Sequence, residues 1–283
     1  MRWRNFTTRS SPASAGESVV RPKRFLDEPH AAEIRAGFSE LRADEGVSYA
    51  TIRDYCDSVD FLPKIPKVDG DLKNVQRPWA VKTLLWLLPP PARCLEIGGA
   101  EPSVRGALSE LGYDVTLVDP YDGCGNGPTE FERYAALFPH VNIARAYLSP
   151  SMPQFRPSSF DAVFSVSVIE YLPAGGALDV CFRATAELLR PGGASLHCFD
   201  FVLQGIGHDY DFGNASKILA HQAALMQRAA DPAELSPILT QLSADVETFY
   251  LSPRGHHRRN GLAYDHFPFR KVVSLQSYAT RAA

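Results

Sequence analysis

The stretch Cys94-Leu-Glu-Ile-Gly-Gly-Ala-Glu-Pro102 decides the fold, because it joins a short apolar run to a helix start through two glycines. The apolar residues before Gly98 predict a buried strand, and Pro102 suits the first turn of the helix that follows. Gly112, just past the expected end of that helix, marks its other terminus. A strand, a glycine turn and a helix in this order are typical of the first unit of a parallel α/β sheet.

Beyond this unit, short apolar runs alternate with amphipathic segments, which is typical of a parallel sheet covered by helices on both faces. Strands are expected at residues 94–97, 115–118, 141–143, 162–166 and 194–201, with helices at 102–111, 130–138 and 178–189. Two later helices, at 215–230 and 232–242, and two later strands, at 246–251 and 271–278, would extend the sheet in antiparallel fashion. The sequence therefore predicts an α/β fold with a doubly wound, mostly parallel sheet.

The chain before the sheet is organised differently. Residues 1–24 are basic and rich in Ser and Thr, which predicts a disordered tail, with an organelle transit peptide as the alternative. Apolar spacing predicts helices at 30–42, 49–55 and 79–88, around a polar, proline-broken connection at 61–77. We therefore expect a tail, an N-terminal helical cap with its connection at 25–91, and a main domain at 92–283 with a C-terminal insertion at about 202–270.

Composition excludes several classes of protein. The 283 residues carry a formal net charge of -3, so no global basic field attracts nucleic acid. No apolar run approaches the roughly 20 residues that span a bilayer. The five cysteines are scattered, without a CxxC pair or zinc-ligand spacing, so we expect no metal site and a cytoplasmic location.

The glycine turn has a polar counterpart at the end of the second expected strand. Asp119 follows Gly98 by 21 positions (119 minus 98), a spacing that suits an acid bound to a ribose diol. Gly98 and Gly99 can adopt positive φ and let a ligand approach the backbone. A dinucleotide and an adenosyl cofactor both satisfy this arrangement. Pro102 favours the adenosyl cofactor, because a pyrophosphate needs N–H donors at the helix start and proline has none.

Four blocks, in their order and spacing, resemble the class I S-adenosylmethionine-dependent methyltransferases over roughly residues 92–201. They are Leu95-Glu-Ile-Gly-Gly, Val115-Thr-Leu-Val-Asp119, Ser159-Phe-Asp-Ala-Val-Phe-Ser-Val-Ser-Val-Ile-Glu-Tyr-Leu172 and Glu187-Leu-Leu-Arg-Pro-Gly-Gly193. The resemblance implies the Rossmann-like methyltransferase fold, with S-adenosyl-L-methionine as the cofactor.

The resemblance also implies roles for individual residues. Glu96 and Gly98 would lie at the methionine end of the cofactor, and Asp119 would hold the ribose hydroxyls. Ser165 and Val166, at the end of the fourth strand, would line the methyl-donor site. The complete expected set of cofactor-binding residues is Glu96, Gly98, Gly99, Ala100, Asp119, Pro120, Ser165 and Val166.

Some residues depart from the family pattern, and the residues that match it also have a purely structural interpretation. Ala100 and Pro102 stand where the family has glycines, and Ser149 lies roughly where an acid often contacts adenine. These departures put the affinity for the cofactor in question more than its identity. The alternative is that the glycines form only a tight turn and that Asp119 only ends a strand. Agreement of the four blocks favours the functional interpretation.

The catalytic residues are less well indicated. Methyl transfer needs mainly an aligned nucleophile, because the sulfonium cofactor itself carries the reactive methyl group. A base is needed only for a poorly nucleophilic acceptor. His208, which follows the fifth strand, is the candidate base, and Asp200 could orient or replace it. A solvated loop histidine is the preferred alternative for His208.

The sequence therefore predicts an enzyme that transfers a methyl group to an oxygen or nitrogen atom of a small molecule or glycan. One alternative is a nicotinamide-dependent oxidoreductase, which Pro102 and the fourth-strand block disfavour. Another is a non-catalytic partner protein that binds an adenosyl cofactor. A small molecule or glycan is the expected partner, nucleic acid is not, and the sequence does not predict an oligomeric state.

Overall fold

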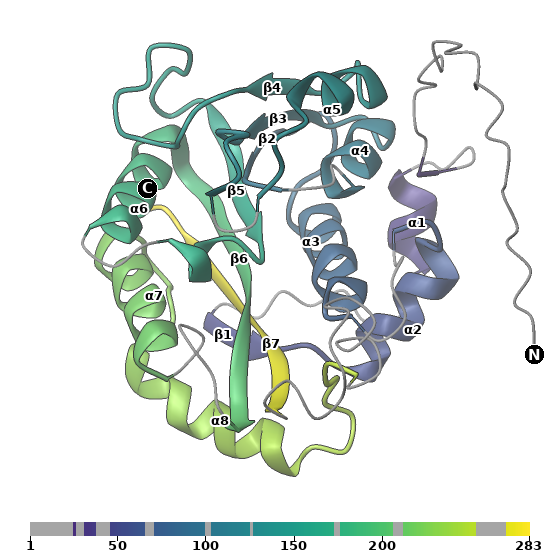
Figure 1. Ribbon diagram of the computed structural model, residues 1–283, viewed down its shortest axis with the longest axis vertical. Helices are drawn as coiled ribbons and strands as arrows, with labels where there is room; N and C mark the ends of the chain where they lie inside the picture. Colours follow the sequence, from purple (N-terminus) through teal and green to yellow (C-terminus); the bar gives the residue numbers. More distant parts are fainter. Residues whose placement is uncertain are drawn as a thin grey trace, which may run out of the picture.

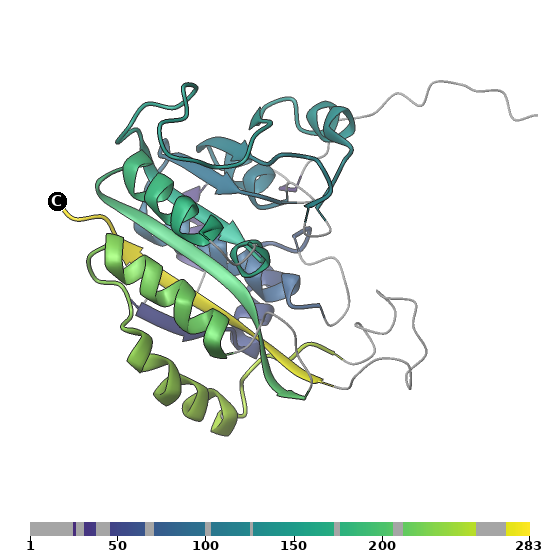
Figure 2. The ribbon, with the colours of Figure 1, turned by 60° about the vertical axis from the view of Figure 1, so that its left-hand side comes forward.

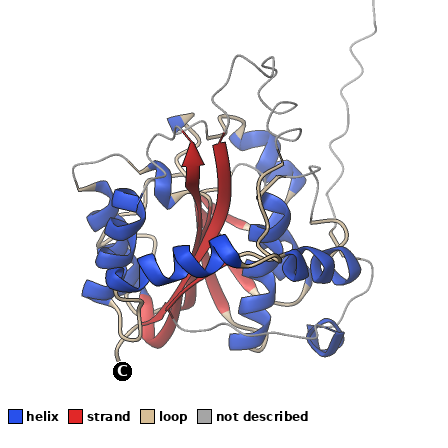
Figure 3. Ribbon diagram, turned by 90° about the horizontal axis from the view of Figure 1, so that it is seen from below, coloured by secondary structure: helices blue, strands red, loops and turns tan. Residues whose placement is uncertain are grey.

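The computed structural model describes residues 25–26, 31–37, 46–65, 71–99, 103–124, 127–172, 176–205, 212–252 and 270–283. These residues form a seven-stranded sheet with helices on both faces (Figure 1 and Figure 3). The strand order is β1-β7-β6-β5-β2-β3-β4, and β7 runs antiparallel to both of its neighbours. The predicted doubly wound, mostly parallel α/β fold is confirmed.

The five parallel strands lie close to their predicted positions. They are β2 (Arg93–Ile97), β3 (Asp114–Val118), β4 (Asn142–Ala144), β5 (Phe160–Val166) and β6 (Leu189–Gly205). Ile97 pairs in register with Val118 on one side and with Ser165 on the other. The carboxyl ends of β2, β3 and β5 therefore meet at one edge of the sheet, where open α/β sheets bind their ligands.

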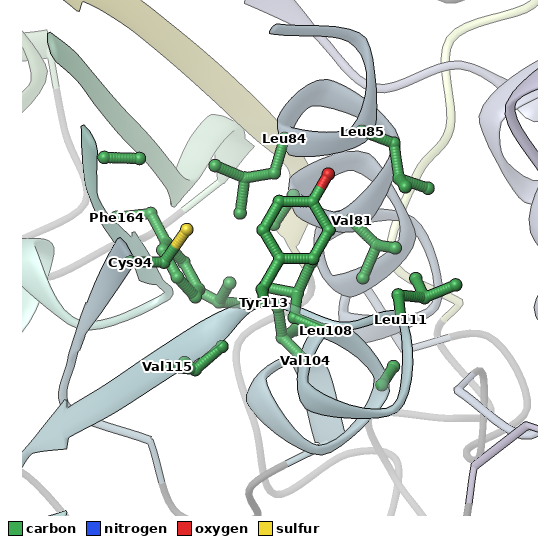
Figure 4. Packing of buried hydrophobic residues seen from close by; sticks show 14 of the residues in the cluster. Val81, Leu84, Leu85, Cys94, Val104, Leu108, Leu111, Tyr113, Val115 and Phe164 are labelled. Atoms are coloured by element: carbon green, nitrogen blue, oxygen red, sulfur yellow. The ribbon is translucent and has the colours of Figure 1, made fainter. Parts of the chain in front are cut away.

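Two layers of helices cover the sheet (Figure 1). On one face lie α3 (Lys73–Leu87), α4 (Ser103–Glu110) and α5 (Phe131–Leu137), and on the other α6 (Ala177–Leu188), α7 (Phe212–Leu225) and α8 (Leu235–Ala244). Val104, Leu108 and Leu111 of the α4 region repeat at helical spacing and are buried against the strands (Figure 4). Burial of such apolar stripes is what holds the layers together.

The N-terminal region contributes a strand to the main sheet. We expected a helix at 49–55, but residues Gly46–Tyr49 form β1, which pairs antiparallel with β7 (Arg270–Thr280). The helix α2 (Ile52–Phe61) starts later, behind a capping box of Thr51 and Asp54. A four-residue strand has little periodicity of its own, so its pairing depends on distant residues. The part of the chain expected to be a helical cap is therefore not purely helical.

The helix that precedes the first parallel strand, α3, begins earlier than predicted. We placed its start at residue 79, whereas α3 begins at Lys73, whose N–H is bound by the Asp71 carboxylate at 2.9 Å. We interpreted Pro78 as part of a broken connection. Pro78 cannot donate to the carbonyl of Asn74, but the Ser58 hydroxyl donates to that oxygen at 3.4 Å instead. A partner from another helix thus lets proline lie inside α3.

One predicted strand is absent. Segment 246–251 makes only isolated bridges, Thr248 with Thr51 and Tyr250 with Val273. The outer edge of β7 is already occupied by β1 between residues 275 and 278, so no complete strand can add there. On its inner edge, β7 pairs with β6 along most of its length, and the two strands run side by side in Figure 2.

The remaining elements are short. They are α1 (Ala31–Gly37), within the expected helix at 30–42, and the two 3-10 turns η2 (Ile169–Tyr171) and η3 (Pro232–Glu234). Within the described ranges, no helix combines the length and the apolar character needed to cross a membrane. The boundaries of the tail, the cap and the C-terminal insertion stay predictions.

Candidate active site

The glycine turn after β2 is packed directly against the segment after β5. Gly98 has φ +64° and Gly99 φ +143°, both in the region that favours glycine. A Cβ atom on Gly98 would lie 2.7 Å from Cγ1 of Val168, which is closer than any side chain tolerates. The turn therefore requires glycine at position 98 for two reasons: its backbone has a positive φ, and the segment after β5 leaves no room for a Cβ atom.

Asp119 ends β3 directly beside this turn. Its carboxylate accepts hydrogen bonds from the N–H groups of Gly99, at 3.0 Å, and Tyr121, at 2.8 Å. Burial raises the pKa of Asp119, and these two backbone donors oppose the rise. A carboxylate can accept about four hydrogen bonds, so about two sites stay available for a ribose diol. The residues present thus fit an adenosyl cofactor.

Glu96 lies beneath the turn in a buried ion pair that the sequence did not predict. Its Oε2 is 3.1 Å from Nη1 of Arg105 on α4, and both side chains are almost completely buried. Arg105 also donates to the carbonyl oxygen of Gly99 at 3.4 Å. Burial raises the pKa of Glu96, whereas Arg105 lowers it. The pair therefore connects β2, the turn and α4, so Glu96 supports the shape of the turn from below.

Ser165 and Val166 end β5 at the expected edge, but the Ser165 hydroxyl points into the protein. It lies 2.8 Å from Nδ1 of His197, and Nε2 of His197 lies 2.9 Å from the Ser195 hydroxyl. Burial lowers the pKa of His197 to about 3, so the imidazole is neutral. A contact of Ser165 with a cofactor would therefore have to come from its backbone. Val166 is buried in the core beside α3 and α4.

A second set of polar side chains lies at the same edge, and we call it the acceptor-side cluster. Its members are Lys73 and Gln76 of α3, Glu170 of η2 and Asp200 of β6. Nε2 of Gln76 donates to Oδ1 of Asp200 at 2.8 Å, and the Asp200 N–H donates to Oε1 of Glu170 at 3.0 Å. The structure thus joins Asp200, a predicted site residue, to three residues that were not predicted.

Charge and burial set the titration behaviour of this cluster. Burial, and next the negative charge of Asp200, raise the pKa of Glu170 to about 8, and Lys73 opposes them. Burial lowers the pKa of Lys73, while Asp200 and Glu170 counteract that effect. Glu170 therefore changes its protonation state near neutral pH, as a general acid or base does.

Of the other predicted site residues, the structure describes Pro120 but not Ala100 or His208. Pro120 follows Asp119 and is half-buried, and its carbonyl oxygen accepts from Nε of Arg145 at 3.4 Å. Ala100 and His208 lie outside the described residues, as does Pro102. Within the described ranges, no group of three or more His, Cys, Asp or Glu residues is placed to hold a metal ion.

The missed residues left different signals in the sequence. Glu170 stands inside the block from Ser159 to Leu172, and an acid four residues after the apolar strand β5 could have been noticed. Arg105 left no such signal, because an exposed arginine can equally follow a buried apolar residue in a helix such as α4. Lys73 and Gln76 are not indicated by the sequence, because the predicted connection at 61–77 includes both residues, whereas the structure places them in α3.

A comparison with protein-family models matches residues 95–196 to the family described as "Methyltransferase domain". No curated protein sequence matches the chain. Residues 95–196 extend from β2 to β6, and they include Asp119, Glu170 and the whole glycine turn.

Solved structures of low sequence identity also match. The 1,6-didemethyltoxoflavin-N1-methyltransferase of Burkholderia thailandensis has 18% identity and a TM-score of 0.44, covering 91% of this chain and 94% of that one. The TehB-like SAM-dependent methyltransferase of Corynebacterium glutamicum has 16% identity and a TM-score of 0.42, with coverages of 70% and 85%. Phosphoethanolamine N-methyltransferase 2 of Haemonchus contortus has 18% identity and a TM-score of 0.39, with coverages of 69% and 50%. This chain thus spans about half the length of the Haemonchus enzyme.

Proposed function

We propose that this chain, a class I S-adenosylmethionine-dependent methyltransferase, transfers the methyl group to an oxygen or nitrogen atom of a small molecule or glycan. The observation that carries most weight is the Asp119 carboxylate, fixed by two backbone N–H groups beside the Gly98 turn. This carboxylate keeps acceptor capacity for a ribose diol.

Each predicted cofactor residue has a proposed role on this basis. Asp119 binds the ribose hydroxyls, and Gly98 and Gly99 let the cofactor approach the backbone. Glu96 holds the turn through Arg105, and the cofactor supplies the reactive methyl group when it is bound. Ala100, Pro120, Ser165 and Val166 are proposed to line the cofactor from the turn, from the segment after β3 and from the end of β5.

Burial supports a small acceptor over a macromolecule. Glu170 is 1% exposed and Gln76 is completely buried, so a flat macromolecular surface would not reach them. A compact molecule, or the tip of a glycan, can enter such a site and be surrounded. Asp200, half-buried at the rim of this cluster, is proposed to orient the acceptor, and His208 remains a second candidate for this role.

The test is methyl transfer from labelled S-adenosylmethionine to a cell extract that has been separated into small molecules, glycans, proteins and nucleic acids. We expect label in the small-molecule or glycan fraction. Asp119→Ala should reduce this labelling, because that variant loses the proposed ribose contact. Label confined to proteins or nucleic acids would contradict the proposed acceptor class, and no label in any fraction would contradict turnover.

A further inference from the structure

The acceptor-side cluster lies next to the glycine turn, although its members are far apart in the sequence. Gly98 contacts Val168, which stands two positions before Glu170. The Ser167 N–H donates to the carbonyl of Cys198 at 2.8 Å, which sets Asp200 of β6 beside η2. The cluster therefore occupies the carboxyl edge of β5 and β6, adjacent to the turn of β2.

Two oxygen atoms in this cluster lack partners. Oε1 of Glu170 accepts from Asp200, but Oε2 is closed off from solvent and has no hydrogen-bond partner in the described part of the chain. Oε1 of Gln76, whose Nε2 donates to Asp200, is also buried and has no hydrogen-bond partner in the described part of the chain. A buried acceptor without a donor is unfavourable, because it has lost its hydrogen bonds to water without replacing them. A bound group with several N–H bonds would satisfy both oxygens.

The charges around these oxygens favour a cation. When Glu170 is ionised, it and Asp200 carry two negative charges, and Lys73 carries one positive charge. One further positive charge would balance the group. Of the two elements that pack most on η2, β6 presents Asp200, and α7 presents the uncharged Asn214, whose Nδ2 donates to the Glu170 carbonyl at 3.2 Å, while α7 also carries Lys217 and His221.

We propose that the acceptor-side cluster binds a protonated amine and that Glu170 removes its proton before methyl transfer. This inference rests on the proposed function and narrows its acceptor to a nitrogen. The ammonium gives one proton to Oε2 of Glu170, which leaves a lone pair on the nitrogen. That pair forms a bond to the methyl carbon of the donor, the carbon–sulfur bond breaks, and its electron pair stays on sulfur. Glu170 then returns its proton to solvent.

The neighbouring residues have separate tasks. Asp200 is a positioning residue, because it holds Glu170 through its N–H and raises the basicity of the carboxylate through its charge. Lys73 has the opposite effect on Glu170. Gln76 fixes the Asp200 side chain and offers its free oxygen to the amine.

The test uses sinefungin, a cofactor analogue in which a carbon bearing an amino group replaces the sulfonium and its methyl. Its ammonium should reach Glu170, whereas S-adenosylhomocysteine has no cation there. Calorimetry should show that the affinity ratio of sinefungin to S-adenosylhomocysteine is about tenfold higher for the wild type than for Glu170→Gln at about pH 9. The ratio should fall between about pH 9 and about pH 6.5, as Glu170, with its pKa of about 8, takes up a proton.

Two further variants separate this mechanism from a structural role of Glu170. Asp200→Asn should move the midpoint of the pH dependence to lower pH, and Lys73→Met should move it to higher pH. Glu247→Gln, which changes an exposed acid paired with Arg53, is the matched control and should leave the ratio unchanged.

Each outcome decides a different point. If S-adenosylhomocysteine does not bind the wild type, the proposed function is wrong. If it binds but the ratio is equal in wild type and Glu170→Gln, the inference about the amine is wrong and the proposed function stands. Should Glu170→Gln not fold, a ratio that stays flat with pH in the wild type would equally overturn the inference.

Discussion

Removal of Arg105 is expected to destabilise the protein strongly, because it leaves the buried Glu96 carboxylate beneath the glycine turn without a partner charge. The Glu96 carboxylate and the Arg105 guanidinium are 3.1 Å apart, and their side chains are 3% and 0% exposed. Breaking such a pair costs about 3–5 kcal/mol, since one charge stays buried without compensation. At about 2–4 °C per kcal/mol for a chain of this size, Arg105→Met should lower the Tm by roughly 6–20 °C.

Urea denaturation monitored by circular dichroism measures the loss in the free energy of unfolding, and two reference variants are compared with Arg105→Met. Arg183→Met breaks an exposed pair with Asp179, at side-chain exposures of 55% and 42%, and should cost less than about 0.5 kcal/mol. The double variant Glu96→Leu with Arg105→Met removes both charges and should recover much of the loss. A cost below about 1 kcal/mol for Arg105→Met, or a double variant no more stable than the single one, would refute this reasoning.

Three further changes have definite outcomes. Asp119→Ala should weaken S-adenosylmethionine binding by roughly 1.5–3 kcal/mol in a folded protein, as calorimetric titration would show, and unchanged affinity would remove Asp119 from the site. Gly98→Ala should impair cofactor binding, because its Cβ would lie 2.7 Å from Val168 and φ is +64°, and partial recovery in Gly98→Ala with Val168→Ala would identify the clash. The pKa of Glu170 is raised from 4.5 to about 8 in the folded wild type, because burial disfavours its charged form. The free energy of unfolding therefore falls as the pH rises from about 4.5 to about 8. Glu170→Gln lacks this loss and should be more stable than the wild type at about pH 9 by up to roughly 5 kcal/mol, with the difference disappearing near about pH 4.5 in urea titrations.

The central strands could be predicted because each is an uninterrupted apolar run between turn residues. Cys94 to Ile97 has this pattern, and its register with β3 and β5 follows from parallel packing. The position of Asp119 beside Gly99 was also predictable, since residues at the ends of adjacent parallel strands share one edge. Local sequence therefore predicted the core of the fold and the position of Asp119 beside the glycine turn.

Contacts between distant segments could not be predicted in the same way. β1 is a strand only because β7 offers an edge to it, more than 220 residues later in the chain. Pro78 is tolerated in α3 because Ser58 satisfies the carbonyl that proline leaves free. Asp200 raises the pKa of Glu170 and accepts a hydrogen bond from Gln76, but no rule of sequence spacing connects Asp200 to either residue. The acceptor-side cluster thus depends on tertiary contacts, whereas the glycine turn depends mainly on one strand–turn–helix unit.

The most direct test of the cofactor assignment is thermal unfolding of the full chain with S-adenosylmethionine, S-adenosylhomocysteine, NAD and NADP at equal concentrations. A ligand that binds the folded state alone raises the Tm as its concentration rises. We expect both adenosyl compounds to raise the Tm and both dinucleotides to leave it unchanged. Stabilisation by a dinucleotide, without stabilisation by either adenosyl compound, would contradict the methyltransferase assignment.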